Sequence, residues 1–133
     1  MKNYVLDAQA VLAFCQGESG ARTVEKLLLD SHSGRVALLM SVVNWGEVYY
    51  ALAHKQGRQA ADAWLQDFDR LPVELVGVDR EMAFAAAELK AKRRLPYADS
   101  FAAALAKLRN ATVVTGDPEF ERTEPEVAIL WLR

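Results

Sequence analysis

The sequence is poor in the residues that cross-link a chain or anchor it in a membrane. One cysteine, Cys15, excludes an internal disulfide, and two histidines with one cysteine cannot form an ordinary zinc site without several carboxylates. No apolar run approaches the roughly 20 residues of a membrane-spanning helix. The N-terminus lacks the long apolar stretch of a signal peptide. We therefore expect a cytoplasmic protein with no membrane association.

The sequence also lacks an excess of charge of either sign. Lysine and arginine number 16 and aspartate plus glutamate 18, a formal net charge of -2. This balance argues against a generally basic nucleic-acid binder, but it allows acidic residues to be gathered in one place. The 133 residues, 52% of them hydrophobic, have the length of one domain. We predict a single domain over residues 1–133.

Short apolar segments alternate with helical patterns along the chain. Strands are predicted at residues 4–6, 36–40, 73–78, 112–115 and 127–132, with helices between the first four of them. A turn is predicted at Gly116-Asp117-Pro118, between the last two strands. The apolar run at 36–40 is typical of a strand buried on both faces. Alternation of this kind predicts an α/β fold with a mainly parallel sheet of about five strands, covered by helices on both faces.

Four carboxylates fall where such sheets bind ligands, beyond the carboxyl ends of the strands. Asp7 follows the first strand, and Asp117 follows strand 112–115 after one glycine. Glu47 and Asp99 lie early in helices that begin at the same edge. Each alone has an ordinary explanation as a helix cap or a solvated residue.

Gathered together, these four acids would repel one another, and a divalent cation would remove that cost. Oxygen ligands without histidine or cysteine suit Mg²⁺ or Mn²⁺. Such an ion can hold a phosphate oxygen and activate a water molecule, which is a route to phosphodiester hydrolysis. The hypothesis is therefore a carboxylate-bound Mg²⁺ or Mn²⁺ ion that serves hydrolysis.

Basic residues gather just before Asp99. Residues 86–109 carry six basic and two acidic residues. Four of the basic residues are consecutive or nearly so: Lys90, Lys92, Arg93 and Arg94. Contact with RNA phosphates and a favourable interaction with the dipole of their own helix are both open for these four.

The four acidic motifs, taken in order, resemble those of PIN domains. They are Val5-Leu6-Asp7, Asn44-Trp45-Gly46-Glu47-Val48, Leu95-Pro96-Tyr97-Ala98-Asp99 and Thr115-Gly116-Asp117. Their order and spacing are similar to those of the small VapC-type toxins of toxin–antitoxin systems. The resemblance covers essentially the whole chain and implies a PIN-like three-layer α/β/α sandwich.

The resemblance also implies an activity, that of a Mg²⁺- or Mn²⁺-dependent endoribonuclease. The implied catalytic and metal-binding residues are Asp7, Glu47, Asp99 and Asp117. Thr115 and Asn44 match supporting positions, and Gln9 replaces the small hydroxyl residue or asparagine usual two positions after the first aspartate. The implied partners are an RNA substrate, a cognate small antitoxin protein and a second copy of the chain in a homodimer.

Two other functions stay open at this point. One is a catalytically inactive PIN-like module that binds RNA or a protein. The other is a receiver-like signalling domain, although Ser41 follows the strand 36–40 where receivers generally place an aspartate that accepts phosphate. Magnesium-dependent RNA cleavage separates the enzyme from both.

Overall fold

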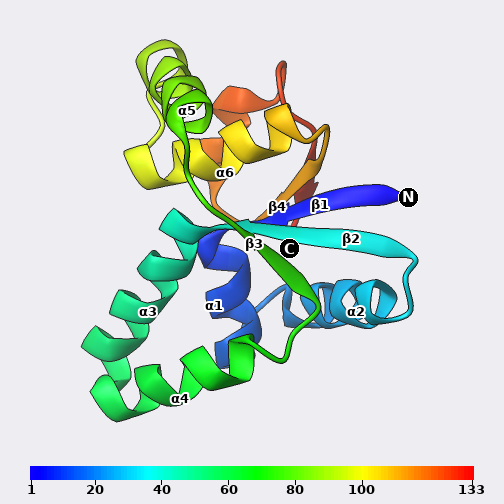
Figure 1. Ribbon diagram of the computed structural model, residues 1–133, viewed down its shortest axis with the longest axis vertical. Coiled ribbons are helices and arrows are strands. Elements are labelled where there is room, and N and C mark those ends of the chain that lie inside the picture. The colour runs from blue at the N-terminus through cyan, green and yellow to red at the C-terminus, as the bar shows by residue number, and fades with distance from the viewer.

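A five-stranded parallel sheet forms the centre of the molecule, whose computed structural model describes residues 1–133 (Figure 1). The strands are β1 (Lys2–Leu6), β2 (Val36–Ser41), β3 (Val73–Val76), β4 (Thr112–Thr115) and β5 (Ile129–Trp131). Their order across the sheet is β3-β2-β1-β4-β5, and every neighbouring pair is parallel. This confirms the predicted α/β class and shows that the sheet is parallel throughout. Receiver domains have the order 2-1-3-4-5, so the receiver-like alternative is wrong.

Helices cover both faces of the sheet, as the sequence predicts. One layer contains α1 (Ala8–Gln16), α2 (Ala21–His32), α3 (Val42–Gln56) and α4 (Arg58–Phe68). The other contains α5 (Arg80–Arg93), α6 (Tyr97–Leu108) and the short 3-10 helix η1 (Pro118–Thr123). In the view of Figure 1 the first layer lies below the sheet and the second above it. None of the helices has both the length and the apolar character needed to cross a membrane.

The strands have two buried faces because successive side chains of a strand point to opposite sides. In β1, Val5 packs against the α5–α6 layer and Leu6 against the α1–α4 layer. In β2, Leu39 and Met40 alternate in the same way. All four are at most 2% exposed. An unbroken apolar run therefore serves two separate cores, which explains why these strands show no polar alternation.

Helix α6 packs closely on the sheet because one side of it consists of small residues. Ala102, Ala103 and Ala106 are at most 1% exposed and belong to the core with Val5 of β1. The absence of larger side chains lets the helix backbone approach the strands. This packing holds the first turn of α6, which carries Asp99, against the carboxyl edge of the sheet.

Several strand boundaries and one turn differ from the sequence prediction. Strand β1 begins at Lys2 and β2 ends at Ser41. Strand β3 ends at Val76, and β5 covers only Ile129–Trp131. The backbone N–H of Val127 donates to the carbonyl of Thr123, so Val127 belongs to the preceding turn and not to the strand. The segment after Asp117 is the helix η1 and not a simple turn, because Asp117 caps it and proline occupies its first position.

Candidate metal and active site

The site lies where the strand order of the sheet reverses. From β1 the chain proceeds outward through β2 to β3, and β4 then pairs on the other side of β1. Ligands of open parallel sheets bind beyond the carboxyl ends of the strands at such a reversal. Asp7 directly follows β1, and Asp117 follows β4 after Gly116. The topology therefore places the first and last predicted ligands on adjacent strands.

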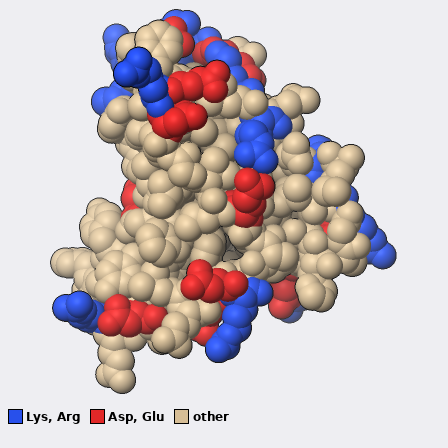
Figure 2. Space-filling model, viewed as in Figure 1, with Lys and Arg blue, Asp and Glu red and all other residues tan.

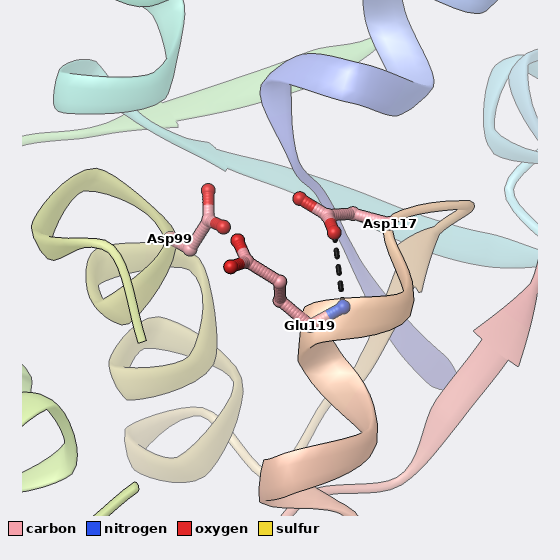
Figure 3. Close-up of side chains that lie close together, drawn as sticks. All are labelled: Asp99, Asp117 and Glu119. Carbon is pink, nitrogen blue, oxygen red and sulfur yellow. Dashed lines mark hydrogen bonds between the residues drawn. The ribbon is translucent and has the colours of Figure 1, made fainter. Parts of the chain in front are cut away.

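Three carboxylates come together closely at this edge (Figure 3). One oxygen from each of Asp99, Asp117 and Glu119 lies within 4.8 Å of the others. Asp99 comes from the first turn of α6, Asp117 from the turn after β4, and Glu119 from η1. The backbone N–H of Glu119 donates to Oδ1 of Asp117 at 2.9 Å, which orients the start of η1. The three carboxylates therefore approach a common point from α6, from the turn after β4 and from η1.

Asp7 is the most deeply buried member of the site. It is 2% exposed and caps α1, with its Oδ1 accepting a hydrogen bond from the backbone N–H of Ala10 at 2.7 Å. Burial raises its pKa to about 7, and the charges of Asp117 and Glu47 act in the same direction. Hydrogen bonding by Thr115 and Ala10 opposes the rise. The ionised form of the Asp7 carboxylate is therefore unfavourable at this position unless a cation neutralises it.

Asp99 shows the same electrostatic cost. Burial raises its pKa to about 7, and the charge of Asp117 is the next largest cause, followed by those of Asp7, Glu47 and Glu119. The charges of the four other carboxylates of the site therefore all act on Asp99. Asp7 and Glu47 nevertheless lie outside the group whose oxygens are within 4.8 Å.

No basic side chain compensates these acids. The seven ion pairs of the structure involve Asp30, Asp62, Asp67, Glu74 and Glu126, and none involves the five acids of the site. Partly buried carboxylates that repel one another, without a cation from the protein, fit a divalent metal ion. The donors are all carboxylate oxygens, which suits Mg²⁺ or Mn²⁺.

Asn44 connects the two helices that carry Glu47 and Asp99. It is fully buried, and its Nδ2 donates to Oε1 of Glu47 and to the carbonyl of Ala98, both at 3.0 Å. The first contact orients Glu47 within α3, and the second reaches the residue before Asp99 in α6. Its Oδ1 is buried and has no partner. These contacts place Asn44 where the supporting role predicted for it would be performed.

Thr115 and Gln9 hold the turn that leads to Asp117. Thr115 is fully buried, and its Oγ1 accepts from the backbone N–H of Asp117 at 3.0 Å. Oε1 of Gln9 accepts from the backbone N–H of Gly116 at 2.6 Å. The unusual glutamine therefore contacts the turn after β4 and connects α1 to it.

Arg93, one of the four basic residues predicted to bind RNA, is engaged within the protein. Its Nε lies 2.7 Å from Oε2 of Glu126, and Nζ of Lys107 lies 2.9 Å from the other oxygen of that carboxylate. Hydrogen bonds from Lys107 and Arg93 lower the pKa of Glu126 to about 2. The contact ties α5 and α6 to the segment before β5, which is a structural use of this cation.

The other three basic residues differ in how free they are. Nζ of Lys90 donates to the carbonyl of Leu95 at 3.0 Å, inside the connection between α5 and α6. Lys92 and Arg94 are exposed and form no ion pair. On the face shown in Figure 2, basic and acidic side chains are interspersed, and neither sign dominates. Their contact with RNA stays a prediction.

The sequence reasoning missed Glu119. The sequence pattern predicts a turn at Gly116-Asp117-Pro118 and therefore no site residue beyond Asp117. An aspartate followed by proline is also a signal for the start of a helix, with the aspartate as cap and the proline at the first position. That signal would have placed Glu119 in a first helical turn beside Asp117.

Known proteins resemble this chain over nearly its whole length. A family model of the PIN domain matches residues 4–125. The structure is similar to that of VapBC2 from Rickettsia felis bound to a DNA fragment from its promoter, with a TM-score of 0.77 and 19% identity, covering 98% of this chain and 99% of that chain. It is also similar to DNA-bound VapBC from Salmonella typhimurium, with a TM-score of 0.76 and 20% identity over 98% of both chains.

A third similar structure is VapC20 from Mycobacterium tuberculosis, described as a sarcin–ricin loop cleaving toxin. Its TM-score is 0.71 at 15% identity, covering 94% of this chain and 96% of that chain. At such identities the similarity concerns the fold. No curated protein matches the sequence.

Proposed function

The chain belongs to the PIN-domain family, and from this premise we propose that it is a VapC-type toxin, an endoribonuclease that uses Mg²⁺ or Mn²⁺ to hydrolyse RNA. The observation that carries the proposal is the group of three carboxylates whose oxygens lie within 4.8 Å of one another at the carboxyl edge of the sheet, without a basic partner. Asp99 and Asp117, two of the four acids predicted from the sequence, belong to this group, and the charges of the other two, Asp7 and Glu47, act on Asp99. The presence of the full acidic set favours an enzyme over an inactive binding module.

The acids of the site have separable tasks in this proposal. Asp99, Asp117 and Glu119 supply the oxygens nearest one another and would hold the ion. Asp7 and Glu47 complete the negative field around it. A bound Mg²⁺ or Mn²⁺ would neutralise charge on the scissile phosphate and lower the pKa of a water ligand.

Binding of the metal ion would also release protons from the carboxyl groups of the site. Carboxylate ligands must be ionised to hold a metal, so metal binding releases protons wherever the ligands are protonated beforehand. Near neutral pH, Asp7 and Asp99 are partly protonated, because their pKa values are about 7. The proposal therefore includes proton release from these two residues on metal binding.

The direct test is RNA cleavage with and without magnesium. Asp7→Asn and Asp99→Asn should each reduce cleavage to the background, and a chelator should do the same to the unmodified protein. Asp67→Asn is the matched control, since Asp67 is exposed on α4 and away from the site. Undiminished cleavage by both site variants would contradict the proposal.

An apolar groove on the α1–α4 layer supports an antitoxin as partner. It has a volume of about 450 Å³, lies between α1, α3 and α4, and is lined mostly by apolar side chains that include Phe14, Trp64 and Leu71. Apolar grooves on a protein surface are common sites for partner segments. Co-expression with the product of a small gene adjacent to this one should yield a complex, and Phe14→Ala, at a half-buried residue of the groove, should weaken it.

The proposal also includes a homodimer that acts in the cytoplasm. Large apolar side chains are exposed at Tyr50 of α3, Phe84 of α5 and Leu108 of α6. Association of two copies would remove such side chains from water. Sedimentation analysis tests this directly, because a dimer has twice the 14.8 kDa of the chain.

A further inference from the structure

The contact between Gln9 and Gly116 joins two segments that are far apart in the sequence. Gln9 lies in the first turn of α1, two residues after Asp7, and Gly116 immediately precedes Asp117. Oε1 of Gln9 accepts from the backbone N–H of Gly116 at 2.6 Å across 107 residues of sequence. The bond therefore links the first turn of α1 to the turn after β4, next to the two carboxylates Asp7 and Asp117.

Gly116 is favoured by the limited space around it and not by its backbone conformation. It is not among the glycines with positive φ, which are Gly17, Gly20, Gly34 and Gly57. A Cβ at position 116 would lie 3.0 Å from Oε1 and 3.1 Å from Nε2 of Gln9, and 3.2 Å from the carbonyl oxygen of Leu132. Real Cβ atoms rarely have such short contacts. The glycine thus makes room for the Gln9 amide.

The contact is continuous with the acidic cluster. After Gly116, the backbone N–H of Asp117 donates to Oγ1 of Thr115, and Oδ1 of Asp117 accepts from the backbone N–H of Glu119. A shift of the Gly116 peptide would therefore move Asp117 and, through η1, Glu119. Both have an oxygen within 4.8 Å of Asp99.

We infer that Gln9 is a positioning residue whose amide fixes the Gly116–Asp117 turn, and with it the spacing of the Asp117 and Glu119 oxygens around a divalent ion. This inference rests on the proposed function, because it assigns the ion to the same acidic cluster. Gln9 itself is not a ligand. It acts on the cluster through the backbone of Gly116.

The experiment measures Mn²⁺ binding to the metal-free protein in the absence of RNA, by electron paramagnetic resonance. The variants are Gln9→Ala, Gly116→Ala and the combination of both, with Gln66→Ala, an exposed glutamine of α4, as the control. Thermal unfolding of each variant checks that it folds. The rate of hydrogen exchange at the Gly116 amide reports the contact itself.

Gln9→Ala should weaken Mn²⁺ binding by about tenfold, within the range seen when groups that orient metal ligands are removed. It should also speed hydrogen exchange at Gly116. Gly116→Ala should weaken binding to a similar degree in the presence of Gln9, but by only about twofold once Gln9 is alanine, because two of the three close contacts are then gone. Gln66→Ala should change neither quantity.

Cleavage provides a second measurement. Gln9→Ala should raise the Mg²⁺ concentration that gives half-maximal cleavage, while the rate at saturating Mg²⁺ stays near that of the unmodified protein. A purely structural role for Gln9 would lower stability without moving this concentration.

Two results would overturn the inference about Gln9. They can be told apart from results that would refute the proposed function. One is unchanged Mn²⁺ affinity in Gln9→Ala, and the other is effects of the two substitutions that simply add. In either case, Mn²⁺ binding that Asp99→Asn abolishes would leave the proposed function intact. Binding that Asp99→Asn does not weaken would instead refute the metal site, and the role of Gln9 with it.

Discussion

Replacing Asp7 by asparagine should stabilise the metal-free protein at alkaline pH while it removes metal binding. The carboxyl of Asp7 is 2% exposed and has a pKa of about 7, against an ordinary value of 3.8. Between these values the folded state binds more protons than the unfolded chain does, so the free energy of unfolding falls as the pH rises. The loss is complete once the pH is above 7. Asparagine cannot ionise and avoids this loss.

The size of the effect follows from the two pKa values. Each pKa unit corresponds to about 1.4 kcal/mol, so the full loss from Asp7 is about 4 kcal/mol, and about 2–3 kcal/mol of it falls between pH 5 and pH 8. Asparagine caps helices about as well as aspartate, so the bond from Ala10 should persist. The Asp7 charge also contributes to the raised pKa of Asp99, so its removal relieves Asp99 as well.

The assay is urea denaturation in a chelator at pH 5 and pH 8, for the unmodified protein and for Asp7→Asn. The comparison between the two pH values cancels any constant effect of the new amide on packing. The unmodified protein should lose about 2–3 kcal/mol more than the variant on going to pH 8. Asp67→Asn, on the surface of α4, should behave as the unmodified protein does. Equal pH dependence in Asp7→Asn would refute the reasoning.

Three further changes test the remaining parts of the site. Glu119→Gln alters one of the three closest carboxylates and should weaken Mn²⁺ binding by about tenfold or more. The control Glu121→Gln, on the exposed side of η1, should leave Mn²⁺ binding unchanged. Equal effects of the two substitutions would argue against Glu119 as a ligand. Asn44→Ala removes two hydrogen bonds of a buried side chain and should lower the free energy of unfolding, measured in urea, by about 1–3 kcal/mol. An unchanged free energy of unfolding would mean that these bonds make no net contribution to stability. Lys92→Gln and Arg94→Gln are combined in one variant, and its RNA affinity is measured by fluorescence anisotropy at several salt concentrations. If both residues contact phosphates, the slope of log affinity against log salt concentration should be smaller by about 1.4. An unchanged slope would mean that the two residues interact with the dipole of their own helix and not with RNA.

The local pattern of the sequence was sufficient for the five strands and the six α-helices, though not for η1 or for every strand boundary, and for the edge of the sheet at which the acids lie. Apolar runs such as 36–40 predicted strands buried on both faces, and the structure buries Leu39 and Met40 on opposite sides. Asp7 and Asp117 could be placed because Asp7 follows β1 directly, Asp117 follows β4 after one glycine, and parallel strands end at a common edge. The alternation of strands and helices depends on patterns within short segments, and it can therefore be predicted from one sequence.

The tertiary structure alone decided which of these acids meet and which cations are free. The strand order β3-β2-β1-β4-β5 makes β1 and β4 neighbours, and the capped helix η1 turns Glu119 toward Asp99. Likewise, Arg93 is paired with Glu126, 33 residues away in the sequence. Such contacts depend on distances between elements, which are set by strand order and by close packing of small residues such as those of α6. Periodicity within a segment contains no information about those distances, so the sequence located the edge of the sheet and the fold assembled the site there.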